Sequence, residues 1–194
     1  MKNSYITTPI YYVNDAPHIG HAYTSTVSDV LSRLRRLNNN NVLFLTGTDE
    51  HGQKVEKSAL KKGKTPLDFC NEISLKFKDL SSFLDISNDD FIRTTQDRHK
   101  KTASFFWKEL ENNGWIYKDV YEGWYSIRDE AFYSKDELID GKAPTGAEVE
   151  WHKEESYFFK LSAFQDILLK IYNEIDGFIC PKSKNKEVIS FVRG

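Results

Sequence analysis

A segment that resembles a buried strand runs through a proline turn into an amphipathic helix, and this arrangement limits the fold more than any other feature. Residues 5–13 are rich in β-branched and aromatic residues, which is typical of a strand. The following Asn-Asp-Ala-Pro, residues 14–17, favours a turn. Apolar residues then recur at helical spacing, and the sequence predicts a helix over 19–37. The stripe consists of Val27, Val30, Leu31 and Leu34.

The alternation of strand and helix continues to about residue 114. Strands are predicted at 42–48 and 91–93, and a strand–helix–strand series with right-handed crossovers implies a parallel sheet. Helices are predicted at 53–62, 65–84 and 97–113. Beyond this point, short aromatic β-rich segments and a final helix at 163–174 indicate a different, α+β organisation. The fold class predicted is therefore α/β, with one domain over 1–114 and a β-rich domain over 115–194.

The tetrapeptide His18-Ile19-Gly20-His21 lies where the first strand gives way to the first helix. Nucleotides bind at this position in open α/β sheets, at the positive end of the helix dipole. His18 and His21 share a face of the first helical turn, from which their N–H groups can reach phosphate oxygens. Gly20 lets a base or ribose approach the backbone. The alternative is that the two histidines only cap the helix or fill space.

Three ordered blocks then carry a resemblance to a known family. They are residues 8–23, residues 44–54 (Phe-Leu-Thr-Gly-Thr-Asp-Glu-His-Gly-Gln-Lys) and residues 123–133. Together they resemble the methionyl-tRNA synthetases, which are class I aminoacyl-tRNA synthetases. The resemblance implies the first half of a Rossmann-like catalytic domain over 1–114 and a connective insertion over 115–194. Family members are much longer, so this chain is expected to be an N-terminal fragment without the second catalytic half and the anticodon-binding domain.

The resemblance also implies an activity, a set of substrates and a set of site residues. The activity is that of a methionine–tRNA ligase, which activates methionine with ATP to methionyl-adenylate and transfers it to the 3′ end of tRNA(Met). Contacts to ATP are implied for Asn14, His18, Gly20 and His21, the two histidines being catalytic. Contacts to methionine are implied for Ile10, Tyr12 and Asp49. For Asp49 the alternative is a loop-capping role, and for Ile10 and Tyr12 it is ordinary core packing.

The connective insertion of many family members carries paired cysteines that bind zinc. Here the corresponding positions hold side chains that cannot form a tetrahedral zinc site, so no structural zinc is expected and magnesium is expected only with ATP. These positions are Ser126, Asp129, Ala143 and Gly146. The chain's two cysteines, Cys70 and Cys180, have no metal-binding spacing and are expected to be reduced thiols.

Length, charge and hydropathy indicate where the protein is located in the cell. They leave open two functions other than that of a methionine–tRNA ligase. The chain has 194 residues, a net charge of −2 and no apolar run of membrane-spanning length, which predicts a cytoplasmic protein without a membrane partner. One alternative is another ATP-dependent ligase or nucleotidyltransferase with the same signature, and a second is a non-catalytic binding module descended from a synthetase. The Lys/Ser-rich residues 182–186 are interpreted as a solvated charge run. An incomplete sheet is expected to expose apolar surface and to limit solubility.

Overall fold

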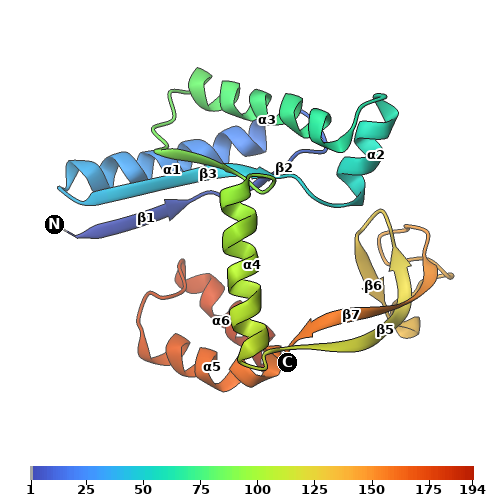
Figure 1. Ribbon diagram of the computed structural model, residues 1–194. Coiled ribbons are helices and arrows are strands. Elements are labelled where there is room, and N and C mark those ends of the chain that lie inside the picture. The colour runs from blue at the N-terminus through green and yellow to red at the C-terminus, as the bar shows by residue number, and fades with distance from the viewer. Residues whose placement is uncertain (1) are drawn as a thin grey trace. The chain divides into compact units, whose positions relative to one another are not determined.

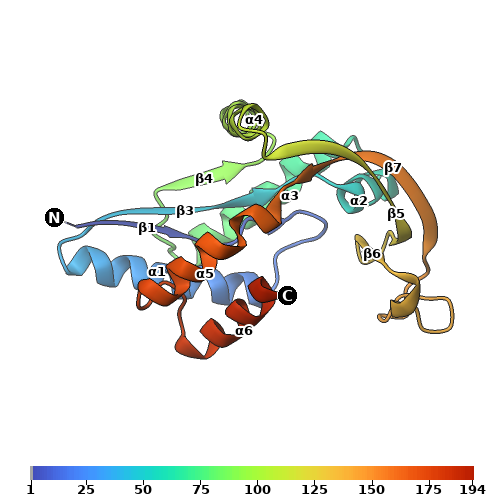
Figure 2. The same ribbon diagram turned by 90° about the horizontal axis from the view of Figure 1, so that it is seen from below.

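The computed structural model describes residues 2–194, which form two compact units. Unit 1 ends at Phe105 and unit 2 spans Phe106–Gly194. The division falls inside the helix α4 (Asp97–Asn112), whereas the domain boundary predicted from the sequence follows that helix. Figure 1 and Figure 2 together label the helices and strands of both units.

Unit 1 is built on a parallel sheet, which confirms the predicted α/β class. The central strand is β3, whose Leu45 pairs with Thr7 on one side and with Asp90 on the other. β1 and β2 therefore share one edge of β3, and β4 forms the opposite edge. The strands are β1 (Asn3–Thr7), β2 (Tyr11–Tyr12), β3 (Asn41–Asp49) and β4 (Asp90–Arg93).

The single strand predicted over residues 5–13 was wrong, because the structure breaks it into β1 and β2. Pro9 lies in the break and has no N–H to donate to a neighbouring strand, while its carbonyl accepts a hydrogen bond from the Thr8 hydroxyl at 2.8 Å. The break leaves Ile10 41% exposed and turns Tyr11 into the core, where only 7% of it remains exposed.

The predicted helices of unit 1 are confirmed. Helices α1 and α3 lie on the same face of the sheet, where His21 of α1 contacts Phe77 of α3 (Figure 2). The start of α3 is fixed as the sequence predicts: the Thr65 hydroxyl accepts from the Asp68 N–H at 3.1 Å, and Pro66 occupies the first turn. The helices are α1 (Ile19–Leu37), α2 (Gln53–Lys61), α3 (Pro66–Phe83) and α4.

The apolar stripe of α1 does not enter the core of the described residues. The buried residues of this helix are small or polar: Ser25, Asp29 and Ser32. Asp29 accepts hydrogen bonds from the N–H and hydroxyl of Ser87 and from Arg33, which ties α1 to the segment before β4. The stripe residues, exposed by 42–60%, are Val27, Val30, Leu31 and Leu34.

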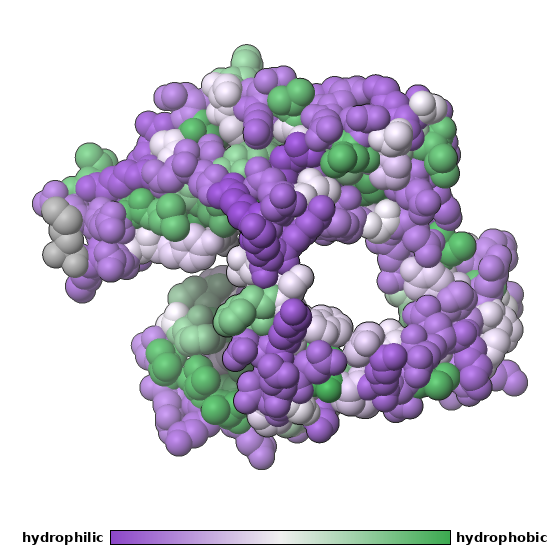
Figure 3. Space-filling model, viewed as in Figure 1, coloured by the Kyte–Doolittle hydropathy of each residue, from purple (hydrophilic) through white to green (hydrophobic). Residues whose placement is uncertain are grey.

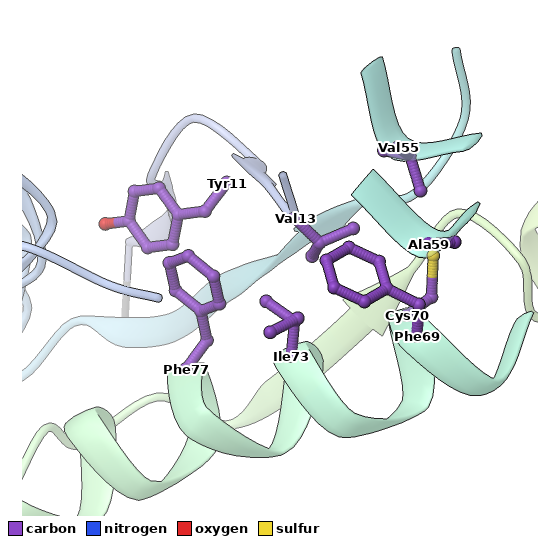
Figure 4. Close-up of a cluster of buried hydrophobic side chains, with 8 residues drawn as sticks. All are labelled: Tyr11, Val13, Val55, Ala59, Phe69, Cys70, Ile73 and Phe77. Atoms are coloured by element: carbon purple, nitrogen blue, oxygen red, sulfur yellow. The ribbon is translucent and has the colours of Figure 1, made fainter. Parts of the chain in front are cut away.

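The hydrophobic core of unit 1 lies between the end of the sheet and the helices α2 and α3 (Figure 4). The rings of Tyr11 and Phe77 stack with their centroids 5.4 Å apart, and Val13 lies beside Ile73. Burying aliphatic and aromatic side chains of this size contributes roughly 1.5–3 kcal/mol each. The cluster is Tyr11, Val13, Val55, Ala59, Phe69, Cys70, Ile73 and Phe77.

Gly47 allows β3 and β4 to pack without a side chain between them. A Cβ at this position would lie 2.0 Å from the carbonyl oxygen of Ile92, a distance that no side chain tolerates. Glycine in a strand is therefore required here by close backbone approach. It sets β4, and with it Arg93, beside the carboxyl end of β3.

Unit 2 contains an antiparallel sheet and two helices, of which the last was not predicted. Residues 182–186, interpreted as a solvated charge run, are largely exposed as expected, and they also form the first part of α6. The apolar residues Val188, Ile189 and Val192 give the segment its helical spacing. The elements are β5 (Ile116–Ser126), β6 (Ala131–Tyr133), β7 (Glu150–Phe159), α5 (Gln165–Glu174), α6 (Lys182–Arg193) and two 3₁₀ turns, Lys135–Glu137 and Leu161–Phe164. Within residues 2–194, no helix has the length and apolar character needed to cross a membrane.

Candidate functional site

The residues singled out in the first two sequence blocks meet at the carboxyl edge of the parallel sheet. β2 lies beside the end of β3, with Tyr12 in register with Asp49. The Val13 N–H donates to the Asp49 carbonyl at 3.2 Å and closes this edge. Residues in register on parallel strands present their side chains to the same face, so Tyr12 and Asp49 share one. Helix α1 begins a few residues after β2, which brings its N-terminus to the same edge.

His18 and His21 form the cap of α1 by bonding to the backbone through their rings. The Nδ1 atom of His18 accepts from the Gly20 N–H at 3.1 Å, and the Nδ1 atom of His21 accepts from the His18 N–H at 3.0 Å. These two bonds make a reciprocal capping box in which both partners are histidines. The ring centroids lie 3.9 Å apart. The capping role weighed as an alternative is therefore real.

Capping does not use up the histidines, because each ring has a second nitrogen. A neutral imidazole that accepts at Nδ1 carries its proton on Nε2. The backbone of residues 18–20 thus selects the same tautomer in both rings, with two Nε2–H donors beside the positive end of the helix dipole. The arrangement suits an anion that has several acceptor oxygens, such as a phosphate chain.

The ring of His21 packs against two aromatic rings, and this burial favours its neutral form. Its centroid lies 4.8 Å from that of Tyr11 and 5.0 Å from that of Phe77, in both cases edge to face. Burial lowers the pKa of His21 below the ordinary histidine value, and the neighbouring His18 lowers it further. The Tyr11 hydroxyl forms a hydrogen bond with the Ser25 hydroxyl at 2.8 Å, which connects Tyr11 to α1.

Gly20 accommodates the ring of His18, a contact that the sequence did not reveal. A Cβ on this residue would lie 2.9 Å from the Cε1 atom of His18, whose ring folds back over the glycine. The missing side chain therefore makes room for the capping histidine. Close approach of a ligand to the Gly20 backbone, as expected from the sequence, stays a prediction.

The other predicted site residues occupy different positions relative to this edge. Asp49 is half-buried at the end of β3, and Tyr12 is half-buried beside it and packs against the core. Asn14 is exposed in the turn that follows β2. Ile10 lies in the break between β1 and β2 and is also exposed. The structure thus brings Tyr12 and Asp49 together and joins them to the histidines through Tyr11.

A buried ion pair beside Asp49 was missed by the sequence analysis. The Glu50 side chain is fully buried, and Arg93 donates to it twice, from Nε to Oε1 at 2.7 Å and from Nη2 to Oε2 at 3.0 Å. Hydroxyls of Thr48 and Thr95 also donate to its two oxygens. Removing one partner of such a pair costs about 3–5 kcal/mol, because it leaves an uncompensated charge. The only signal in the sequence was the acidic residue following Asp49.

Cys70 and His51 complete the surroundings of this ion pair. The Cys70 thiol lies 3.6 Å from the Glu50 carbonyl, and burial together with the Glu50 carboxylate raises the thiol pKa to about 11. The thiol therefore stays protonated, as expected of a reduced structural cysteine. The His51 Nε2 atom lies 3.3 Å from the Thr94 carbonyl. Its contact agrees with a role in steadying the loop.

In unit 2, hydrogen bonds connect the segment of Ser126 and Asp129 with the segment of Ala143 and Gly146. The Asp129 carboxylate accepts from the Tyr133 hydroxyl at 3.1 Å and from Thr145, and its N–H donates to Ser126 at 3.2 Å. Arg128 donates to the Thr145 carbonyl at 2.7 Å. Among residues 2–194, no group of three or more His, Cys, Asp or Glu side chains is arranged to hold a metal ion. The absence of structural zinc stays a prediction.

Comparison with known proteins identifies the family. The sequence model described as "tRNA synthetases class I (M)" matches residues 4–149, well over half of the chain. The chain belongs to this family. A class I (M) relative, the methionine–tRNA ligase of Rickettsia bellii (strain RML369-C), is 60% identical over 195 residues. The methionine–tRNA ligase of Rhizobium meliloti (strain 1021) is 50% identical over 194 residues.

Solved structures of the class I (M) family also match. The Mycobacterium tuberculosis methionyl-tRNA synthetase in complex with methionyl-adenylate superposes with a TM-score of 0.93 at 44% identity, over 100% of this chain and 39% of that chain. This match confirms the Rossmann-like fold class. The chain spans only 38% of the length of the two curated relatives, covering 100% of itself in the first alignment and 97% in the second.

Proposed function

We propose that this chain supplies the ATP-binding and methionine-binding half of a methionine–tRNA ligase. The single observation that carries the proposal is the capping box of His18 and His21, which leaves two Nε2–H donors at the helix N-terminus, at the same sheet edge as Asp49. Family membership and the methionyl-adenylate bound by the M. tuberculosis relative support the choice of substrates. ATP enters with Mg²⁺ bound to its phosphates.

The proposed reaction needs positioning and charge stabilisation more than covalent chemistry. A carboxylate oxygen of methionine attacks the α-phosphorus of ATP, and the bond to the pyrophosphate oxygen breaks. Negative charge builds on the phosphoryl oxygens, where His18 and His21 donate from Nε2. The lowered pKa of His21 favours its neutral form, in which Nδ1 accepts the His18 N–H while Nε2 donates to the phosphate.

The amino acid is proposed to bind on the other side of this edge. Asp49 pairs with the α-ammonium group, since a half-buried carboxylate attracts a cation more strongly than an exposed one. Tyr12 and Ile10 line the side-chain pocket, where the Tyr12 ring gains up to about 1 kcal/mol against the thioether. Gly20 and Asn14 approach the nucleotide. The product is transferred to the 3′ end of tRNA(Met) in the cytoplasm.

The test is methionine-dependent exchange of pyrophosphate into ATP by the full-length gene product that contains this chain. We expect His21→Ala to lower kcat by about 10²–10³-fold, the usual cost of removing one donor to a developing oxyanion. Asp49→Ala should instead raise KM for methionine. His99→Gln, on α4, is the matched control and should leave both constants unchanged.

The two alternative functions give different results in this assay. A related ATP-dependent ligase or nucleotidyltransferase would bind ATP but exchange pyrophosphate only with another acid or with no acid. A binding module would give no exchange at all. A folded full-length product without methionine-dependent exchange would contradict the proposal.

A further inference from the structure

The buried carboxylate of Glu50 lies next to Asp49 in the chain but cannot contact a ligand. Each of its two oxygens accepts two hydrogen bonds, one from Arg93 and one from a threonine hydroxyl, Thr48 or Thr95. Four bonds use the acceptor capacity of a carboxylate. Its side chain is also fully buried. Any part that Glu50 has in function must therefore act through the backbone.

The backbone on both sides of the Asp49–Glu50 peptide is held in the same way. On the β2 side, the Val13 N–H donates to the Asp49 carbonyl at 3.2 Å. On the β4 side, the Glu50 N–H donates to the Thr94 hydroxyl at 2.9 Å. The peptide between the two acidic residues is thus fixed from both neighbours, and with it the backbone from which the Asp49 side chain projects.

Strand alternation separates the two acidic side chains. Glu50, the residue after β3, accepts from the Thr48 hydroxyl, so its side chain lies on the Thr48 side, and Asp49 at the end of β3 faces the opposite side with Tyr12. We propose that Glu50, held by Arg93, is a positioning residue that orients the Asp49 carboxylate toward the α-ammonium group of the amino acid. This inference rests on the function proposed above.

The chemistry of the pair favours orientation over stability. Burying two charges costs desolvation energy that their attraction only offsets, and apolar residues of the same size often give equal or greater stability. The planar guanidinium of Arg93 can donate to both oxygens of a carboxylate only when the two groups lie in one plane. It also donates from Nη2 to the Asn71 side-chain oxygen at 2.8 Å. A binding group supported in this way loses little entropy when its ligand arrives.

The decisive experiment uses the full-length gene product and the variant Glu50→Gln, which keeps the shape of the side chain. We expect KM for methionine to rise by about tenfold or more, since displacing a binding group by 1 Å costs up to about 10²-fold. KM for ATP should stay within about twofold, because the histidine cap is formed within residues 18–21 at the start of α1. Methylsulfanylbutyrate, which is methionine without its α-amino group, serves as a competing ligand. Its inhibition constant should be unchanged by Glu50→Gln.

Three further variants separate positioning from folding. Arg98→Gln is the matched control, since it breaks a two-bond pair with Asp90 on the exposed surface of the same segment and should change no constant. In an Asp49→Asn background, Glu50→Gln should raise KM for methionine no further. Arg93→Lys keeps the positive charge but cannot donate to both carboxylate oxygens at once. If Glu50→Gln does not fold, Arg93→Lys should show the same rise in KM for methionine.

The outcomes distinguish this inference from the proposed function. Wild-type protein without methionine-dependent exchange would overturn both. Active wild-type protein in which Glu50→Gln weakens methionine, ATP and the deaminated analogue alike, with a lowered melting temperature, would assign the pair to folding alone and overturn the inference. A normal KM for methionine in folded Glu50→Gln and Arg93→Lys would do the same.

Discussion

At the scale of single residues, the protonation state of His21 is set by its neighbours. Burial against Tyr11 and Phe77 is the larger cause of its lowered pKa, and the charge of His18 is the smaller one. Because folding lowers this pKa, protonation penalises the folded state. The contribution of His21 to the free energy of unfolding is complete above the ordinary histidine pKa of about 6.5. It is lost as the pH falls from there through the lower pKa that His21 has in the folded state.

We expect His18→Asn to raise the pKa of His21 without returning it to the ordinary value. Asparagine keeps an N-cap acceptor but removes the electrostatic influence of the His18 ring on His21, while burial remains. NMR titration of the His21 Cε1–H signal in this chain measures the shift. His99→Asn is the control and should leave the His21 titration unchanged. A His21 pKa that stays constant or falls in His18→Asn would contradict the assignment of the second cause.

At the scale of elements, α3 supplies the side of the core on which β2 rests. Ile73 of this helix is fully buried in the cluster with Val13, whereas Leu75, two residues later, is 56% exposed. The two side chains have the same number of carbon atoms and occupy the same helix. A comparison of alanine substitutions at these two positions therefore tests the effect of burial alone.

We expect Ile73→Ala to lower the free energy of unfolding of unit 1 by about 2–5 kcal/mol, through lost burial and the cavity left behind. Leu75→Ala should change it by no more than about 0.5 kcal/mol. Hydrogen exchange of the β3 and α3 amides measures both values within unit 1, independently of unit 2. Equal losses for the two variants would show that α3 does not pack as described.

At the scale of the whole molecule, patches of apolar side chains remain open to solvent on a surface that is mostly hydrophilic (Figure 3). The stripe of Val27, Val30, Leu31 and Leu34 on α1 is the longest such row on one helix of unit 1. Both edges of the sheet in unit 1 are also without a further strand among the described residues. Exposed apolar rows and open sheet edges favour association between copies.

We expect this 194-residue chain to associate as its concentration rises, and Val30→Lys with Leu34→Lys to reduce the association. The substitutions replace apolar surface by charge at positions that are already exposed, so the fold should be unaffected. Sedimentation velocity over a range of concentrations gives the measurement. Thr26→Lys, on the same helix, adds charge without removing apolar surface and should have a smaller effect. A chain that stays monomeric at all concentrations would contradict the prediction.

Local pattern determined most of the elements. The ends of α1, the Thr65 cap of α3 and the parallel order of the strands follow from spacing, capping residues and the alternation of strand with helix. It failed at two places among the described residues. Pro9 splits a run that has the composition of one strand, and the helix α6 begins in a charged segment that was not predicted to be helical.

The sequence by itself determined the family, the α/β class and the positions of His18, His21 and Asp49 at the ends of elements. Only the tertiary structure decided how those residues are held. The tautomer of the two histidines depends on backbone N–H groups, Gly20 leaves room for the ring of His18, and Glu50 finds its partner Arg93 on β4. The physical reasons differ: the Glu50–Arg93 pair joins groups that are 43 residues apart, whereas the histidine cap depends on side-chain rotamers that residue types alone do not fix.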